Sequence, residues 1–296
     1  MYSSSKKRRG NQKLMKRFLI FFGWLLILQT LHAGYKYELS SCAIFMEDDL
    51  PYMSEWIEFH KHQGVQHFYL YNNGPVDVWK TYLDQYEREG FIEVIEWNHG
   101  SQNVIEWNSI QTQAYMHCLK KITKESKWCA IIDTDEFLFT LPYKNLRRAL
   151  KNYEEFAGVV ANWVMYGTSN VDYIPEGQKL TDLLVRRGAV DGDLHVKSIV
   201  KPAYVVDIMN PHSFIYSTNK FAVNENKELV HGAFTAKNSV NIFRINHYWC
   251  RDKSFLIHTK LARRLKWGQP IESVLEIEKG YNIEHDDIIK NFNNYD

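Results

Sequence analysis

Two aspartates one residue apart, Asp133 and Asp135, have the clearest potential for chemistry in this chain. They follow the apolar segment Trp128-Cys129-Ala130-Ile131-Ile132, which is typical of a buried strand. In extended backbone, side chains two positions apart point to the same side, so the two carboxylates can share one divalent cation. Oxygen ligands with positions left open for water and phosphate suit Mg2+ or Mn2+. Such a cation can neutralise a departing nucleoside diphosphate, which is the chemistry of sugar transfer from a nucleotide sugar.

A second Asp-x-Asp pair, Asp191 and Asp193, lies in a different context. It surrounds Gly192 and follows Arg186-Arg187-Gly188, a composition that predicts a solvated turn. No buried strand leads into this pair. The metal site is therefore predicted at Asp133 and Asp135.

The composition excludes one class of partner. The 296 residues carry a net charge of +1, which gives no basis for nucleic-acid binding. Aromatic residues make up 15% of the chain, enough to build both a core and surfaces on which sugars stack. Cys42, Cys118 and Cys129 read as small buried apolar residues, although a disulfide stays open because connectivity does not follow from sequence.

The start of the chain predicts a membrane segment. Residues 1–17 are strongly basic and residues 18–31 are uncharged and apolar. The basic flank predicts a cytoplasmic tail, and a stretch extended through residue 35 approaches the roughly 20 residues of a helical span. We expect a transmembrane signal anchor over residues 18–35 and a lumenal domain of the ER or Golgi type in a eukaryote. A signal peptide cleaved after Ala33 is the alternative and would make the protein secreted or periplasmic.

We expect a single domain over residues 36–296 after the anchor. Its strands and helices must position the two aspartates. Strand-like and helix-like segments alternate here. The expected strands are 39–46, 66–72, 91–97 and 128–132, and the expected helices are 51–63, 76–88 and 105–122. Such βαβ units predict an α/β fold with a mainly parallel central sheet, in which ligands bind at the carboxyl ends of the strands. Glu47, Asn72 and Asp133 would then meet at one edge.

Several segments in a fixed order resemble glycosyltransferase family 92 and the related family-2-like transferases with a GT-A (Rossmann-like) fold. The resemblance spans roughly residues 40–265 and is carried by five segments: Glu55-Trp56-Ile57-Glu58-Phe59-His60-Lys61-His62-Gln63-Gly64-Val65-Gln66-His67-Phe68-Tyr69-Leu70-Tyr71-Asn72-Asn73, Trp128-Cys129-Ala130-Ile131-Ile132-Asp133-Thr134-Asp135-Glu136-Phe137-Leu138, Asn162-Trp163-Val164-Met165-Tyr166-Gly167-Thr168-Ser169, His195-Val196-Lys197-Ser198-Ile199-Val200-Lys201-Pro202 and Ile245-Asn246-His247-Tyr248-Trp249-Cys250-Arg251-Asp252-Lys253-Ser254. The chain has Thr168-Ser169-Asn170 where Ser-Gly-His is frequent in the family. Because of this difference, the resemblance does not identify the acceptor.

The resemblance implies an inverting, metal-dependent hexosyltransferase that uses Mn2+ (or Mg2+) and a nucleotide sugar, most often a UDP-hexose such as UDP-galactose, with a glycan or glycoconjugate as acceptor. On that template Asp135 ligates the metal, Asp133 approaches the ribose or the metal, and His247 completes the metal site. Glu47 and Asn72, at the first two strand ends, would hold the nucleoside. Lys253 would reach the diphosphate.

The downstream candidate residues also have alternative roles that are structural. His247 can be a hydrogen-bonded structural histidine, and His212 can take its place at the metal. Lys197 and Lys201 are expected to be solvated. Trp163 would be a sugar platform only if it faces the cleft.

Single displacement requires a carboxylate that deprotonates the acceptor hydroxyl. The sequence leaves this base open among four residues: Asp172, Glu176, Asp191 and Asp193. Two other classes of function are compatible with the same residues. A metal-dependent hydrolase of nucleotide sugars or phosphoesters would use the same strand-end carboxylates, and a catalytically silent carbohydrate-binding protein would need only the aromatic residues.

Overall fold

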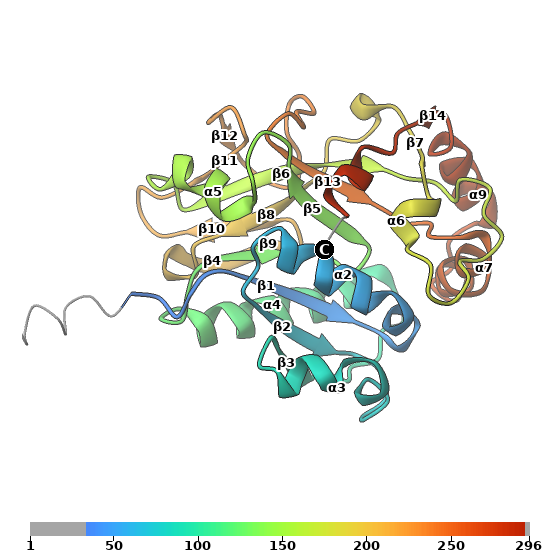
Figure 1. Cartoon of the computed structure of the whole chain (residues 1–296), viewed down its shortest axis with the longest axis horizontal. Helices are drawn as coiled ribbons and strands as arrows, with labels where there is room; N and C mark the ends of the chain where they lie inside the picture. Colours follow the sequence, from blue (N-terminus) through green and yellow to red (C-terminus); the bar gives the residue numbers. More distant parts are fainter. Residues whose placement is uncertain (1–33, 294–296) are drawn as a thin grey trace, which may run out of the picture. The chain divides into compact units, whose positions relative to one another are not determined.

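The computed structural model describes residues 34–293 (Figure 1). The chain divides into two compact units, Met1–Lys36 and Tyr37–Asp296. The predicted tail and nearly all of the predicted anchor lie outside the described residues. Among residues 34–293, no helix combines the length and the apolar character needed to cross a lipid bilayer.

A central mixed sheet forms the framework of the second unit. The order of its strands is β12-β11-β6-β8-β4-β1-β2-β3, and β13 pairs with both β6 and β5. The bounds of these strands are β1 Tyr37–Phe45, β2 His67–Asn72, β3 Ile92–Glu96, β4 Ser126–Ile131, β5 Glu136–Thr140, β6 Gly158–Met165, β8 Val196–Val200, β11 Ala222–Val223, β12 Leu229–Val230 and β13 Phe243–His247.

The first half of this sheet confirms the predicted βαβ pattern. Strands β1, β2, β3 and β4 are parallel, and α2 (Leu50–His62), α3 (Lys80–Arg88) and α4 (Val104–Ile122) connect them. Each of these elements lies within a few residues of its expected bounds. Because the strands are parallel, β1, β2 and β4 all end at the same edge of the sheet.

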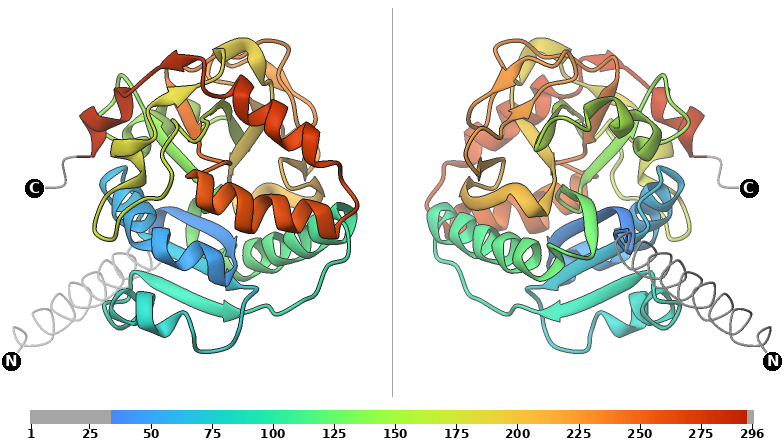
Figure 2. Two further views of the ribbon diagram at one scale, coloured as in Figure 1. Left: turned by 90° about the vertical axis from the view of Figure 1, so that its right-hand side faces the viewer. Right: turned by 90° about the vertical axis from the view of Figure 1, so that its left-hand side faces the viewer.

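The period of two along each strand sends side chains to two separate cores. In β1, Leu39, Ala43 and Phe45 pack on the side of α2, whereas Cys42 and Ile44 pack with α4 on the other side. The helices thus cover both faces of the parallel strands (Figure 2). All four cysteines are buried and free, which confirms the interpretation of Cys42, Cys118 and Cys129 as small apolar core residues.

The second half of the sheet departs from the mainly parallel arrangement that was expected. Strand β8 is antiparallel to both of its neighbours, β4 and β6, and β13 is antiparallel to β5. An antiparallel strand runs in the opposite direction, so β8 begins at the edge where β4 ends. This reversal brings residues of β8 beside the end of β4.

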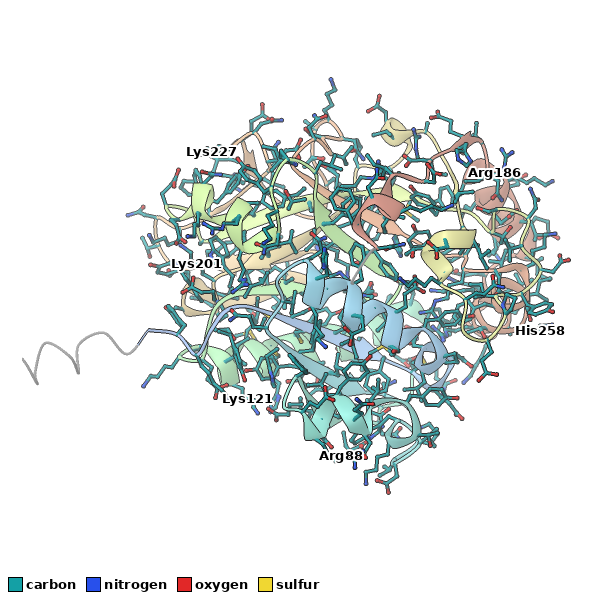
Figure 3. All side chains as sticks on the ribbon, viewed as in Figure 1. Arg88, Lys121, Arg186, Lys201, Lys227 and His258 are labelled. Carbon is teal, nitrogen blue, oxygen red and sulfur yellow. The ribbon has the colours of Figure 1, made fainter. Side chains whose placement is uncertain are left out.

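Short elements complete the unit around the sheet. Their bounds are α5 Leu146–Leu150, α6 Leu180–Leu183, β7 Arg186–Arg187, β9 Val205–Asn210, β10 Ser213–Tyr216, α7 Lys253–Phe255, α8 Ala262–Lys266, α9 Ile271–Gly280 and β14 Glu284–His285. A π-helical turn, Leu256–Leu261, joins α7 to α8. Long charged side chains such as those of Arg88, Arg186 and Lys227 project outward from the ribbon (Figure 3).

Candidate active site

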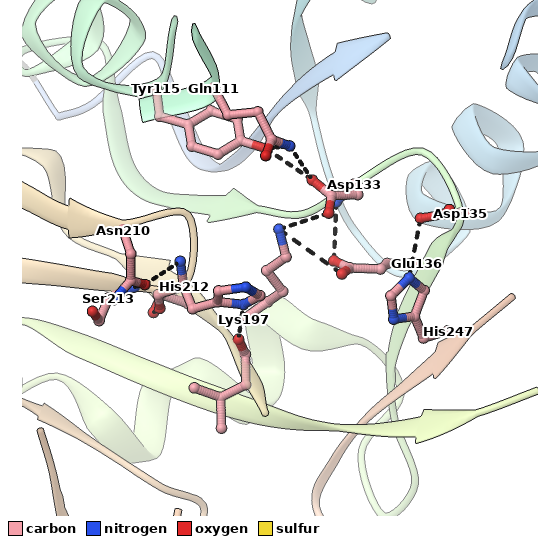
Figure 4. Close-up of polar contacts among 12 residues, drawn as sticks. Gln111, Tyr115, Asp133, Asp135, Glu136, Lys197, Asn210, His212, Ser213 and His247 are labelled. Carbon is pink, nitrogen blue, oxygen red and sulfur yellow. Dashed lines mark hydrogen bonds and ion pairs between the residues drawn. The ribbon is translucent and has the colours of Figure 1, made fainter. Parts of the chain in front are cut away.

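Asp133 lies two residues beyond the end of β4 and is held by three side chains (Figure 4). Its Oδ1 accepts hydrogen bonds from the Tyr115 hydroxyl (2.9 Å) and from Nε2 of Gln111 (3.3 Å), both on α4. Its Oδ2 lies 2.9 Å from Nζ of Lys197. Both oxygens of Asp133 therefore already have partners, and its carboxylate is fixed in direction.

Lys197 corrects the expectation of a solvated lysine, because its side chain is 0% exposed. The antiparallel register pairs Ser198 of β8 with Ile131 of β4, which sets Lys197 beside the turn that carries Asp133. Its Nζ also lies 3.8 Å from Oε1 of Glu136, a fully buried carboxyl group. Lys201 is buried as well, with its Nζ 4.6 Å from the centre of the Trp128 ring. Lysines on an edge strand would be solvated, but β8 is an interior strand of the sheet.

The charges of this cluster compensate one another. Burial alone would raise the pKa of Asp133, but the ammonium group of Lys197 outweighs that effect and lowers it. Burial opposes the charge of Lys197, yet the carboxylates of Asp133 and Glu136 raise its pKa above the ordinary value. Burial raises the pKa of Glu136 well above its usual range. Asp133 and Lys197 thus form the ion pair, and Glu136 is the group that takes up a proton first.

Asp135 forms a second polar cluster with His247 and Lys260. The strand β13 pairs His247 with Glu136, which brings Nε2 of His247 to 3.3 Å from Oδ1 of Asp135. Nζ of Lys260 lies 2.8 Å from Oδ2 of the same carboxylate. Burial alone would raise the pKa of Asp135, but Lys260 and His247 hold it well below its usual range. Asp135 is therefore ionised at neutral pH.

These clusters border one pocket. Its lining includes Asp133, Asp135 and His247 together with three cationic side chains, Lys260, Arg263 and Arg264. Four tryptophans share that lining: Trp107, Trp163, Trp249 and Trp267. Carboxylates beside cations and flat aromatic rings suit a ligand that is a sugar at one end and a diphosphate at the other.

His212 also lines this pocket, beside Trp163. Its Nδ1 lies 2.9 Å from the Val196 carbonyl oxygen, and the ring centres of His212 and Trp163 are 5.1 Å apart. Burial lowers the pKa of His212 to about 3, so the imidazole is neutral at pH 7. The contact to a carbonyl assigns the proton to Nδ1 and leaves Nε2 as a hydrogen-bond acceptor. A ring with so low a pKa is a poor general base.

The predicted nucleoside residues lie together at the ends of β1 and β2. Glu47 is exposed and its backbone packs closely on Gly74, whose N–H donates to Oδ1 of Asn72. Asn72 is buried and donates to Glu96. Neither residue lines the pocket, but Asp48 approaches the pocket residue Arg263 at 3.7 Å. This loop and the pocket are therefore neighbours.

Lys253 is placed differently from the predicted metal residues. Its Nζ lies 2.9 Å from the exposed Asp172, and Lys253 does not line the pocket. Asp172 and Glu176 are exposed, and Asp191 lies in an exposed 3-10 turn. The structure does not bring these four residues to Asp133 and Asp135.

Asp193 is the base candidate with a connection to the pocket. Its Oδ1 lies 2.7 Å from Nδ1 of His195, and the His195 ring stacks on Trp163 with 5.0 Å between ring centres. Asn238 donates to the backbone carbonyls of both Trp163 and Asp193. Burial alone would raise the pKa of Asp193, but its hydrogen bonds from His195 lower it.

The predicted metal residues offer only part of a coordination sphere. Within residues 34–293, no three His, Cys, Asp or Glu side chains are gathered as a complete metal site. Oδ1 of Asp135 and Nε2 of His247 nevertheless lie 3.3 Å apart, and one carboxylate oxygen with one imidazole nitrogen would fit Mn2+ if phosphate and water supplied the remaining ligands. Asp133 is nearby, but both of its oxygens are engaged.

Comparison with known proteins identifies the family. Residues 35–260 match the family model described as glycosyltransferase family 92. The chain belongs to this family. A family 92 protein of Arabidopsis thaliana, At1g27200, is 24% identical over 227 residues, which cover 73% of this chain and 36% of that relative. The family 92 protein Os08g0121900 of Oryza sativa subsp. japonica is 25% identical over 213 residues, which cover 71% of this chain and 33% of that relative. The chain thus spans about a third of the length of these relatives.

Solved structures resemble this family 92 chain only slightly. The crystal structure of S. aureus TarS 1-349 has 12% sequence identity and a TM-score of 0.37, and it covers 81% of this chain and 69% of that chain. A similarity of this size says nothing about activity.

The family 92 match also separates two groups of pocket residues. It includes Asp133, Asp135, His247 and Lys260, and it ends before Arg263 and Arg264. Sequence reasoning missed Lys260, Arg263 and Arg264, which all face the pocket from the segment after β13. The signal available in the sequence was the cluster of four basic residues within Lys260-Leu261-Ala262-Arg263-Arg264-Leu265-Lys266-Trp267, which ends in a tryptophan.

Proposed function

We propose that this family 92 protein is a hexosyltransferase of the GT-A type. It transfers a galactose-like hexose from a UDP-linked nucleotide sugar to a hydroxyl group of a glycan acceptor with inversion. One observation carries the proposal: a single pocket joins Asp133, Asp135 and His247 to the cations Lys260, Arg263 and Arg264. Carboxylates and cations in this arrangement suit a diphosphate leaving group, which needs both a metal and direct positive charge.

The two aspartates would have different roles in the reaction. Asp135 and His247 would hold Mn2+ or Mg2+, which as a Lewis acid stabilises charge developing on the diphosphate. Lys197, Tyr115 and Gln111 hold Asp133 in one orientation, so that the remaining lone pair of its Oδ2 could accept a hydrogen bond from the donor ribose without reorganising.

The other end of the pocket would hold the sugar and its acceptor. Trp163 lines the pocket and offers an aromatic face, and the neutral His212 beside it can accept a hydrogen bond from a hydroxyl group. Among the four candidates for the base, Asp193 is favoured because His195 connects it to Trp163. The proposed reaction breaks the bond between the anomeric carbon and the diphosphate oxygen, while the acceptor oxygen forms the new bond and loses its proton to the base.

The cellular location of this activity is inferred from the N-terminal sequence. We propose that residues 18–35 anchor the protein in a membrane, with residues 1–17 in the cytoplasm and the domain on the lumenal side. The acceptor would then be a glycan or glycoconjugate that reaches the same side.

The test is a donor screen with the full chain. UDP, GDP or CMP release is measured from each nucleotide sugar, with and without an acceptor mixture, and with and without Mn2+. The proposal expects UDP release that requires both Mn2+ and acceptor. Release without acceptor would instead indicate a hydrolase.

A matched pair of variants connects the activity to the site. Asp135→Asn removes a charged ligand at nearly constant shape, and it should reduce the rate by a factor on the order of 100 or more. Asp172→Asn alters an exposed carboxylate outside the pocket and should leave the rate near that of the wild type. Wild-type turnover in Asp135→Asn would exclude Asp135 as a metal ligand.

A further inference from the structure

Lys260 reaches the pocket from an unusual element. It belongs to the π-helical turn Leu256–Leu261, and π-helical turns insert one extra residue and redirect the side chains around them. Its Nζ lies 5.4 Å from the centre of the Trp249 ring and 5.9 Å from that of Phe255. The side chain is 14% exposed, so this ammonium group is confined within the pocket wall.

The carboxylate of Asp135 belongs to the proposed metal site and also pairs with Lys260. Oδ2 of Asp135 lies 2.8 Å from Lys260, and Oδ1 lies 3.3 Å from Nε2 of His247. A divalent cation held by Oδ1 and Nε2 would therefore be only a few ångströms from an ammonium group. Two positive ions at that distance repel strongly where water is largely excluded.

The remaining charges of the pocket do not relieve this repulsion. Arg263 and Arg264 add two more cations to the lining, and the carboxylate of Asp133 is already paired with Lys197. A diphosphate would bring the missing negative charge. It can bind the metal through its oxygens and accept hydrogen bonds from Lys260 at the same time.

We propose that Lys260 makes metal binding at Asp135 and His247 conditional on the diphosphate of the donor. The inference rests on the proposed function and deepens it. Without nucleotide, the ammonium group of Lys260 occupies Asp135 and weakens metal binding. With nucleotide, the ammonium group bonds to the diphosphate, and metal and nucleotide strengthen each other by the same factor.

The experiment measures binding of Mn2+, without turnover. The full chain is titrated with Mn2+ in the absence and presence of saturating UDP, and free Mn2+ is followed by electron paramagnetic resonance. Lys260→Met removes the charge at similar length. Lys253→Met is the matched control, because Lys253 pairs with Asp172 and not with Asp135. Asp135→Asn corrects for the complex that Mn2+ and UDP form in solution.

Lys260→Met is expected to bind Mn2+ alone on the order of 10-fold more tightly than the wild type. UDP should tighten Mn2+ binding in both proteins, because the diphosphate itself offers oxygen ligands, but the gain should be on the order of 10-fold larger in the wild type, where UDP also draws Lys260 away from Asp135. Lys260→Arg keeps the charge and should behave as the wild type, as should Lys253→Met.

Equal Mn2+ affinities of the wild type and Lys260→Met, with equal gains from UDP, would overturn this inference and leave the proposed function intact. Absence of site-specific Mn2+ binding in the wild type even with UDP would overturn both the inference and the metal-dependent part of the proposed function. A retained far-ultraviolet circular dichroism spectrum confirms that each variant is folded.

Discussion

At the scale of single residues, the two aspartates of the motif have different surroundings. Asp133 is tied to α4 and β8 through Tyr115 and Lys197. Asp135 faces His247 and the ammonium group of Lys260. A carboxylate with fixed partners orients its neighbours, whereas one that shares its charge with a lysine can exchange partners. We therefore expect Asp135 to govern metal affinity and Asp133 to govern the placement of the donor.

The two histidines of the pocket allow a prediction about function. His247→Ala should raise the Mn2+ concentration for half-maximal activity by on the order of 10-fold to 100-fold, because imidazole adds to a carboxylate ligand and does not replace it. His212→Ala should instead raise the acceptor KM with little change in metal dependence, because His212 packs on Trp163, the proposed sugar platform. Steady-state kinetics with Mn2+ and acceptor varied separately measures both. The reverse pattern would exchange the two assignments.

At the scale of secondary structure, a buried histidine joins α2 to β5. Nδ1 of His60 lies 2.8 Å from the Trp56 carbonyl oxygen, and Nε2 accepts the backbone N–H of Leu138 at 3.0 Å. Burial lowers the pKa of His60 to about 3 from 6.5. The folded protein therefore keeps this ring neutral, while the unfolded chain protonates it below pH 6.5.

This difference predicts the direction of a pH effect. The unfolded state binds one more proton than the folded state between pH 6.5 and about pH 3, so stability present above pH 6.5 is lost as the pH falls. From pH 7 to pH 5, His60 should lower the free energy of unfolding by about 2 kcal/mol. Urea denaturation should show that His60→Gln loses this contribution and His62→Gln, at an exposed position of α2, retains it. An equal change in the free energy of unfolding between pH 7 and pH 5 in the wild type and both variants would contradict the assignment of this effect to His60.

A close contact between strands gives a second prediction at this scale. A Cβ atom on Gly158 of β6 would overlap the hydroxyl group of Tyr216 and lie 3.1 Å from Cβ of Ala222. Gly158→Ala should therefore lower the free energy of unfolding by about 1–3 kcal/mol. Gly100 has open space around it, so Gly100→Ala should change stability by less than about 0.5 kcal/mol. The free energies of unfolding are measured by urea denaturation, and their dependence on urea concentration should be unchanged. Equal stability of the two variants would show that Tyr216 moves aside freely.

The elements differ in how far the sequence could predict them. Strands β1 to β4 are five to nine residues long and alternate with helical segments, and these local patterns are sufficient to predict them. Strands β7, β11, β12 and β14 have two residues each, too few to show an alternation. The direction of β8 depends on pairing with distant strands, so the burial of Lys197 could not be read from its own neighbours.

The site shows the same division. Asp133 and Asp135 were predictable because they directly follow a strand with a strong local signal. His247 was identified by resemblance to the family, and the pairing of β13 with β5 explains its position. The basic cluster that begins at Lys260 is visible in the sequence, but its position in the pocket could not be predicted, because a π-helical turn changes which residue faces the pocket and leaves no periodic pattern. Lys253 was favoured instead because it lies nearer to His247 in the sequence.

At the scale of the whole molecule, the orientation in the membrane is testable. Residues 1–17 should be cytoplasmic, and everything after about residue 35 should lie on the other side, because basic flanks remain in the cytoplasm. In sealed vesicles with the lumenal side enclosed, added protease should remove only an N-terminal tag. Digestion of the domain in intact vesicles would contradict this topology. An N-terminus at Gly34 in the mature protein would show that the segment is a cleaved signal peptide.

The pairing of β13 with β5 has a consequence for the order of events during synthesis. Strands β1 to β4 are complete once about 130 residues have emerged, but β5 finds its partner only after about a hundred more. Closing so long a loop is entropically costly, which makes such contacts late ones in folding. At 5–20 residues per second, the ribosome needs roughly 5–20 s to deliver β13 and the π-helical turn behind it. Until then Asp135 has neither His247 nor Lys260 beside it, so the nascent protein acquires its folded framework before it acquires its pocket.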